Sequence, residues 1–290
     1  MFSGSIPACV TPFRNGQFDG QAFVALIEWQ IAEGSHALCV CGTTGEAPTL
    51  PLDEHHRIIA EAVRVVDGRV PVIAGCGSND TATALDHVAR AAASGADAAL
   101  VVTPYYNRPS QEGLIRHYET LADASGLPIV LYSVPSRTGV DFTVETISRL
   151  ARHERIVAIK DATGDLGRVA LTRVACGEGF TQLSGNDETA VGFNAMGGEG
   201  CISVTANVAP RLCAALQEAT WNGAYGTARA VQHRLAPLHA ALFADNSPAP
   251  TKYALSRLGM TTDEVRSPLA VCSEAARRVV DAALAHAGVI

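Results

Sequence analysis

Short apolar runs that are rich in β-forming residues recur along the chain at intervals of a few tens of residues. We find eight: "SIPACV" from residue 5, "ALCVC" from 37, "VPVIAG" from 70, "AALVVT" from 98, "PIVLYS" from 128, "IVAIK" from 156, "FTQLSG" from 180 and "GCISVT" from 200. Segments with helical spacing, such as "AFVALIEWQIAEG" and "HHRIIAEAVRVVDG", lie between most of them, and several end at a glycine. Near-continuous apolar strands that alternate with amphipathic helices predict a parallel sheet covered by helices.

The number of these units indicates the architecture. Eight βα units in about 220 residues favour an α/β fold of the closed (β/α)8 TIM barrel type over an open doubly wound sheet, which is the alternative. After residue 222 the strand runs cease and the pattern becomes helical, with "DNSPAP" as a connector. We therefore expect a barrel over residues 1–222 that carries the active site, and a C-terminal three-helix extension over 223–290.

Composition narrows the class of protein. The 290 residues are 48% hydrophobic and 18% charged, and no apolar run approaches the roughly 20 residues of a membrane span. A net charge of −7 without a basic cluster argues against nucleic acid or an anionic membrane as the main partner. The start "MFSGSIPACVTPF" lacks the basic and apolar regions of a signal peptide, so we expect a cytoplasmic protein with eight reduced, buried cysteines.

Lys160 ends the apolar run "IVAIK" and is the first candidate for chemistry. In a barrel the C-terminal ends of the strands carry the active site, so this strand would deliver its amine to the barrel mouth. Poor hydration there favours the neutral amine, which can attack a carbonyl and form a Schiff base. Other strand ends supply Tyr132, Thr43 and Tyr106 as proton carriers and Arg137 as a bidentate partner for a carboxylate.

Each of these residues also has a structural interpretation when it is taken alone. A lysine that ends a strand is commonly a solvated edge residue, a tyrosine can bridge core and surface, and the loop residues can simply form turns. Catalysis is favoured because all five residues fall at strand ends on one face of the same predicted barrel.

Metal and nucleotide sites have little support from the residue spacing. The nine histidines show no HExxH pattern, and "DEHH" at 53–56 is better explained as the acidic first turn of a helix. "GCGSND" from residue 75 lacks the lysine that follows the glycines of a P-loop. We therefore expect neither a metal nor a nucleotide cofactor.

Several longer motifs resemble one enzyme family. They are "GSIPACVTPF", "GTTGEAPTL", "VTPYYNRPSQEGL", "LYSVPSRTG", "IVAIKDATGD", "LSGND" and "CISVTANVAP". Through these motifs the chain resembles the 4-hydroxy-tetrahydrodipicolinate synthases, also called dihydrodipicolinate synthases, over essentially its whole length. The resemblance implies a lyase of diaminopimelate and lysine biosynthesis that holds pyruvate as an imine on Lys160 and condenses it with L-aspartate 4-semialdehyde. It implies no other cofactor.

The same resemblance assigns roles to the site residues. Tyr132, Thr43 and Tyr106 would form a proton relay, with Tyr106 reaching in from a neighbouring subunit of a homotetramer. Thr44 would bind the carboxylate of pyruvate and Arg137 that of the semialdehyde. The main chain near Gly185 and Ile202 would line the pocket.

The sequence alone leaves two alternatives to this function. Sister enzymes of the superfamily, such as N-acetylneuraminate lyase and 2-keto-3-deoxygluconate aldolase, share the lysine and the tyrosine, and Arg137 in "PSRTG" favours the synthase over them. A non-catalytic binding protein on the same barrel would have no use for an imine-forming lysine.

The feedback site for lysine, which the resemblance also implies, departs from the usual pattern in this chain. Lysine-inhibited members commonly have histidine, serine and glutamate where this chain has Leu52, Ala47 and Thr83. Three further positions match the pattern, namely His55, Asn79 and Tyr105. We therefore expect weak or absent inhibition by L-lysine.

Overall fold

Eight parallel strands form the centre of the chain, whose computed structural model describes residues 2–290. They are β1 (Gly4–Pro7), β4 (Leu38–Val40), β5 (Val72–Gly75), β6 (Ala98–Val102), β7 (Ile129–Ser133), β8 (Ile156–Asp161), β9 (Thr181–Ser184) and β10 (Gly200–Ser203). Neighbouring strands pair in the order β1-β10-β9-β8-β7-β6-β5-β4, and a parallel bridge between Ala8 and Cys39 joins the two ends. The predicted closed (β/α)8 barrel is therefore confirmed.

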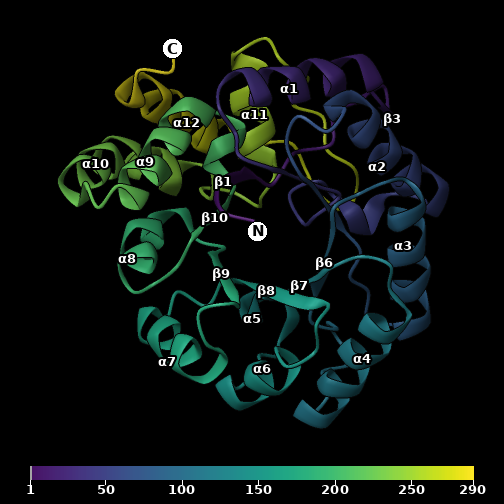
Figure 1. Cartoon of the computed structure of the whole chain (residues 1–290). Helices are drawn as coiled ribbons and strands as arrows, with labels where there is room; N and C mark the ends of the chain where they lie inside the picture. The colour runs from purple at the N-terminus through teal and green to yellow at the C-terminus, as the bar shows by residue number, and fades with distance from the viewer. Residues whose placement is uncertain (1) are drawn as a thin grey trace.

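Helices follow the strands and surround them (Figure 1). Those of the barrel are α1 (Gly20–Ala32), α2 (Leu52–Val66), α3 (Thr81–Ala93), α4 (Gln111–Ala124), α5 (Pro135–Thr138), α6 (Val144–Leu150), α7 (Leu166–Cys176), α8 (Ala190–Ala195) and α9 (Pro210–Trp221). Short 3-10 turns occur at Ala47–Thr49, Asp187–Thr189 and Thr205–Asn207. Side chains of Asp19, Asp80, Ser110 and Asp165 cap helix N-termini by accepting backbone N–H groups, which fixes where these helices begin.

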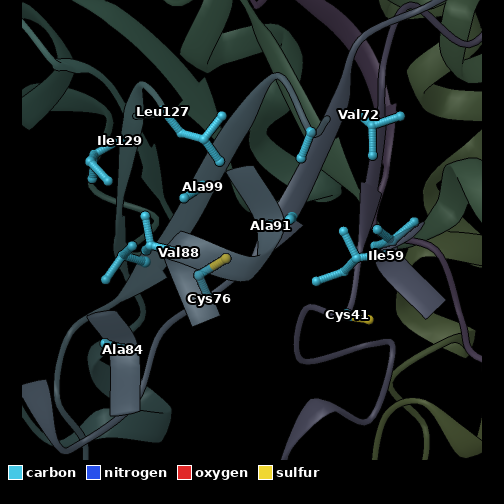
Figure 2. Close-up of a cluster of buried hydrophobic side chains, with 14 of the residues drawn as sticks. Cys41, Ile59, Val72, Cys76, Ala84, Val88, Ala91, Ala99, Leu127 and Ile129 are labelled. Carbon is cyan, nitrogen blue, oxygen red and sulfur yellow. The ribbon is translucent and has the colours of Figure 1, made fainter. Parts of the chain in front are cut away.

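Each strand is buried on both faces, which explains the near-continuous apolar runs. The inward faces form a cluster that contains Ile73, Val130, Tyr132 and Ile202. The outward faces pack against the helices in a larger core, part of which is seen in Figure 2, where Val72 and Ala99 of the strands lie near Ile59 and Val88 of the helices. Successive residues alternate between the two clusters, as a pleated strand requires.

The C-terminal helices are α10 (Tyr225–Ala241), α11 (Ala249–Arg257) and α12 (Glu274–Ala287). In Figure 1, α9, α10 and α12 lie at one side of the barrel; α10 packs against both α9 and α12, and α12 also packs against α11. They share one apolar cluster with barrel residues, among them Val10, Leu26 and Val204. These helices are therefore packed onto the barrel rather than around a core of their own.

Smaller features complete the fold. A two-stranded hairpin of β2 (Phe13–Arg14) and β3 (Gln17–Phe18) precedes α1, and the sequence pattern did not predict it. The eight cysteines are free thiols, and all except the half-buried Cys176 are buried, as expected. Across residues 2–290, none of the helices combines the length and apolar character that crossing a membrane requires.

Candidate active site

Lys160 lies near the C-terminal end of β8, directly beside Tyr132 of β7. The two residues are partners in the parallel register, and each is 6% exposed. Nζ of Lys160 lies 4.2 Å from the centroid of the Tyr132 ring, over its face. Lys160 faces the barrel interior, because Ala158, two residues earlier on the strand, belongs to the interior cluster. The strand therefore holds the amine against an aromatic ring, in a position with little access to solvent.

Few other nucleophiles could compete with this amine. The chain has two lysines and 20 arginines, and the second lysine, Lys252, is fully buried in an ion pair with Glu46. Burial raises the pKa of the nearby Cys39 thiol to about 11, and it raises that of Cys201 well above its ordinary value. Both thiols are therefore protonated near neutral pH, which leaves Lys160 as the candidate nucleophile.

Gly185, directly after β9, lies against Lys160. A Cβ atom at this position would lie 3.2 Å from Cε of Lys160 and 2.6 Å from Cβ of Ala162. Glycine is therefore required beside the lysine for space. Ile202 of β10 is fully buried and belongs to the same interior cluster as Tyr132.

The loop after β4 carries Thr43 and Thr44. Glu46 has a left-handed backbone, with φ of 56°, and its N–H donates to the carbonyl oxygen of Thr43 at 3.1 Å. The hydroxyl of Thr11 donates to the carbonyl oxygen of Gly45 at 2.7 Å. Thr44 is buried and Thr43 is half-buried. These contacts hold both threonines in a fixed turn.

A cleft of about 460 Å³ connects several of the expected residues. Its wall includes Thr43, which follows β4, and Tyr132 and Arg137, which lie on β7 and on the α5 turn directly after it. Arg137 lies on α5 and is exposed, so its guanidinium is accessible to an anion that enters the cleft. Lys160 is not part of this wall, and it adjoins the cleft at the ring of Tyr132.

Tyr106 does not join the other candidates within one chain. Its side chain is 90% exposed and its backbone is left-handed, with φ of 71°. The loop around it is nevertheless anchored, because Asn107 Nδ2 donates to the carbonyl oxygen of Asn79 at 2.7 Å and Arg108 Nε donates to that of Gly139 at 2.9 Å. An ordered loop thus presents this tyrosine to the outside of the chain.

The positions of the expected lysine site line another part of the same cleft. They are Ala47, Leu52, His55, Thr83 and Tyr105, whereas Asn79 is not part of the wall. The hydroxyl of Thr83 donates to Asp80 at 2.7 Å and is thereby engaged. Of the described residues that form this wall, none is acidic. The cleft therefore offers an incoming ammonium group no carboxylate.

A polar network on the outer face of β7 and β8, behind Tyr132 and Lys160, was not predicted from the sequence. Ser133 and Asp161 directly follow the inward-facing tyrosine and lysine, so they face outward. Arg168 of α7 approaches Asp161 (Nε to Oδ2, 3.3 Å) and Asp141 (Nη1 to Oδ2, 2.6 Å), and the hydroxyl of Ser133 donates to Asp141. The network ties the ends of β7 and β8 to each other from outside the barrel. The alternation of side chains along a strand places Ser133 and Asp161 on the outer face, and this pattern could have predicted the network.

Asp187, in the "SGND" motif, is a second residue whose role was not predicted. It is 6% exposed, and its carboxylate accepts the N–H groups of Val204 and Thr205 at 2.9 and 3.0 Å and the hydroxyl of Ser203. The carboxylate thereby joins the loop after β9 to the end of β10.

Known proteins share this arrangement over the whole chain. Residues 1–287 match the family described as the Dihydrodipicolinate synthetase family. The chain is 60% identical to the 4-hydroxy-tetrahydrodipicolinate synthase of Sphingopyxis alaskensis and 58% identical to that of Rhizorhabdus wittichii, with 100% of both chains covered in each case. The crystal structure of the chloride-inhibited dihydrodipicolinate synthase from Acinetobacter baumannii complexed with pyruvate matches with a TM-score of 0.98 at 42% identity, again over 100% of both chains. The chain therefore belongs to the dihydrodipicolinate synthetase family.

Proposed function

We propose that the chain is a 4-hydroxy-tetrahydrodipicolinate synthase, a lyase that condenses pyruvate with L-aspartate 4-semialdehyde in lysine biosynthesis. The observation that carries this proposal is the position of Lys160. The residue is 6% exposed and its amine lies over the Tyr132 ring. The amine adjoins a cleft that has Thr43 and Arg137 on its wall. The pyruvate complex of the related A. baumannii enzyme supports the choice of the first substrate.

The chemistry begins with attack of the neutral Lys160 amine on the ketone carbon of pyruvate. The carbinolamine loses water to give an imine, and loss of a proton from the methyl group gives an enamine. The enamine carbon then attacks the aldehyde of the second substrate. Cyclisation through the amino group of that substrate displaces Lys160 and gives the heterocycle.

Each step moves a proton, and each substrate carries a carboxylate. We assign proton transfer to Tyr132, Thr43 and Tyr106, and recognition of the pyruvate carboxylate to Thr44. Arg137 would bind the carboxylate of the semialdehyde, because a guanidinium pairs with a carboxylate bidentately. Gly185 and Ile202 would contribute main-chain groups to the pocket. Imine formation supplies the electron sink, so this proposal requires no metal or organic cofactor.

The exposed position of Tyr106 supports an assembly in which it completes the site of a second copy. An ordered loop that presents an aromatic side chain at 90% exposure is suited to insertion into a neighbouring subunit. We propose that the chain forms the homotetramer that the family resemblance implies. We also propose that it is located in the cytoplasm, because thiols such as its eight free cysteines are kept reduced there.

Turnover of both substrates tests the proposed function. The product is converted by a dihydrodipicolinate reductase, and the loss of NADPH absorbance is followed. We expect turnover that requires pyruvate and L-aspartate 4-semialdehyde together. Folded protein that forms the pyruvate adduct but shows no turnover would instead indicate an aldolase with a different acceptor.

Arg137→Ala distinguishes these two enzyme classes. We expect kcat/KM for L-aspartate 4-semialdehyde to fall about 10- to 100-fold, the equivalent of about 1.5–3 kcal/mol for a hydrogen-bonded charge pair, while the pyruvate adduct still forms. Arg116→Ala, at an arginine whose side chain is 78% exposed on α4, is the matched control and should behave as wild type. Full activity of Arg137→Ala would contradict the substrate assignment.

L-Lysine is expected to inhibit the enzyme weakly or not at all. Without an acidic residue among the described residues of the cleft wall, binding of the lysine ammonium loses on the order of 1–3 kcal/mol. The measurement is turnover at saturating substrates as L-lysine is increased. Thr83→Glu, which supplies a carboxylate, should increase the sensitivity. Half-inhibition of the wild type at submillimolar lysine would show that this expectation is wrong.

A further inference from the structure

Three histidines meet at one part of the cleft, two from α2 and one from α3. The ring centroids of His55 and His87 are 4.3 Å apart, and that of His56 lies 5.4 Å from each of them. One ligand nitrogen from each ring lies within 4.8 Å of those from the other two, and no other group of three potential ligands within residues 2–290 has this geometry. His55 and His87 also form part of the cleft wall.

Four of the six ring nitrogens in this cluster are buried without a hydrogen-bond partner. Nε2 of His55 lies 2.9 Å from the carbonyl oxygen of Gly75, which can only accept, so Nε2 carries the proton and Nδ1 has the free lone pair. This Nδ1, both ring nitrogens of His56 and Nδ1 of His87 are buried without a partner. Buried polar atoms are normally paired, so four unpaired nitrogens in one cluster require an explanation.

Burial of the three rings also affects how readily they take up a proton. Burial lowers the pKa of all three histidines, and that of His55 falls to about 3. The lowered pKa favours the neutral imidazole, which carries the lone pair that a cation binds.

We propose that His55, His56 and His87 together bind a divalent transition-metal cation of the kind that imidazole prefers, for which Zn²⁺ is the probe. The hydrogen bond from His55 to a backbone carbonyl is the support that metal-binding histidines commonly have. In a tetrahedral site with bonds of about 2.0–2.1 Å, the ligand nitrogens lie about 3.3 Å apart, so ring rotations must bring them closer by up to about 1.5 Å.

The position of the site gives it access to the cleft. Because His55 and His87 line the cleft, a metal held by them would adjoin the space that also reaches Thr43 and Arg137. Water or an anionic group could occupy the fourth coordination position. The inference adds a site outside the reacting atoms and does not rest on the proposed function, whose chemistry uses no metal.

Isothermal titration with ZnCl₂ tests the proposal on the full-length protein after treatment with a chelator. We expect one Zn²⁺ per chain. His87→Leu removes one ligand and should weaken binding by at least about tenfold. His153→Leu is the matched control, because it removes a histidine that pairs with Asp123 in a different part of the chain, and it should bind zinc as the wild type does.

Two results would overturn the proposal. One is the absence of zinc binding by the wild type, and the other is equal affinity in wild type, His87→Leu and His153→Leu, which would place the ion on thiols or other histidines. If circular dichroism shows that His87→Leu does not fold, His56→Gln, which retains a polar side chain of similar size, replaces it. The same loss of affinity is then expected, and zinc binding equal to that of the wild type would again overturn the proposal.

Discussion

Replacing Lys160 with alanine is expected to abolish turnover and the covalent pyruvate adduct together. The chain has one other lysine, and its side chain is fully buried against Glu46, so no second side-chain amine can substitute. Removal of a covalent nucleophile typically lowers kcat by several orders of magnitude, on the order of 10⁶-fold where it has been isolated. We therefore expect the largest catalytic effect in the chain at this position.

The adduct is measured by borohydride reduction in the presence of pyruvate, followed by intact mass and peptide mapping. Because the chain has two lysines, the modified peptide identifies the reacting side chain directly. Tyr132→Phe is the companion variant, since it keeps the aromatic ring and the amine and removes only the hydroxyl; we expect it to form the adduct on Lys160, more slowly than the wild type, and to turn over slowly. An undiminished adduct in Lys160→Ala would show that the imine forms elsewhere.

The barrel could be predicted because each strand can be recognised from its own apolar sequence. A strand of a parallel sheet that is covered on both faces must be apolar at nearly every position, so "AALVVT" and "PIVLYS" are recognisable without their partners. The hairpin Phe13–Arg14 with Gln17–Phe18 has strands of two residues, too short for any period to be detected. The placement of Lys160 and Tyr132 followed from the fold, because both end strands of one barrel.

Partners that are distant in the sequence could not be predicted. The histidine cluster was hidden because His87 lies on a different helix from "DEHH", and spacing along one helix cannot reveal a ligand on the next. Likewise, the carboxylate of Glu46 in "GTTGE" meets Lys252, which is 206 residues away. Long-range pairs of this kind depend on how the helices pack around the barrel, and the local sequence pattern does not indicate that packing.

The Glu46–Lys252 pair connects the loop that carries Thr43 and Thr44 to the C-terminal helices. Nζ of Lys252 donates to Oε1 of Glu46 at 2.5 Å and to the carbonyl oxygen of Glu264 at 2.8 Å, and the Arg266 N–H donates to the other oxygen of Glu46 at 2.9 Å. Nζ also lies 4.0 Å from the centroid of the Phe13 ring. Burial lowers the pKa of Lys252 to about 8 although Glu46 opposes the shift, so the lysine is charged at neutral pH.

Lys252→Met is therefore expected to lower the free energy of unfolding by about 3–5 kcal/mol, because it leaves Glu46 as a buried charge without its partner. The change should also reduce kcat, since Glu46 ends the turn that holds Thr43. Urea denaturation and the coupled assay measure the two effects. Arg116→Met, which breaks an ion pair with side chains 78% and 53% exposed, is the control and should cost less than about 1 kcal/mol.

The double variant Lys252→Met with Glu46→Gln separates the cost of an isolated buried charge from the loss of the pair itself. Because the double variant removes both charges, part of the lost stability should return. Recovery of stability without recovery of kcat would mean that the carboxylate of Glu46 also positions the Thr43 turn through the Arg266 N–H that it accepts. If Lys252→Met alone stays within about 1 kcal/mol of the wild type, the pair does not anchor this loop, and the C-terminal helices contribute to the site by packing alone.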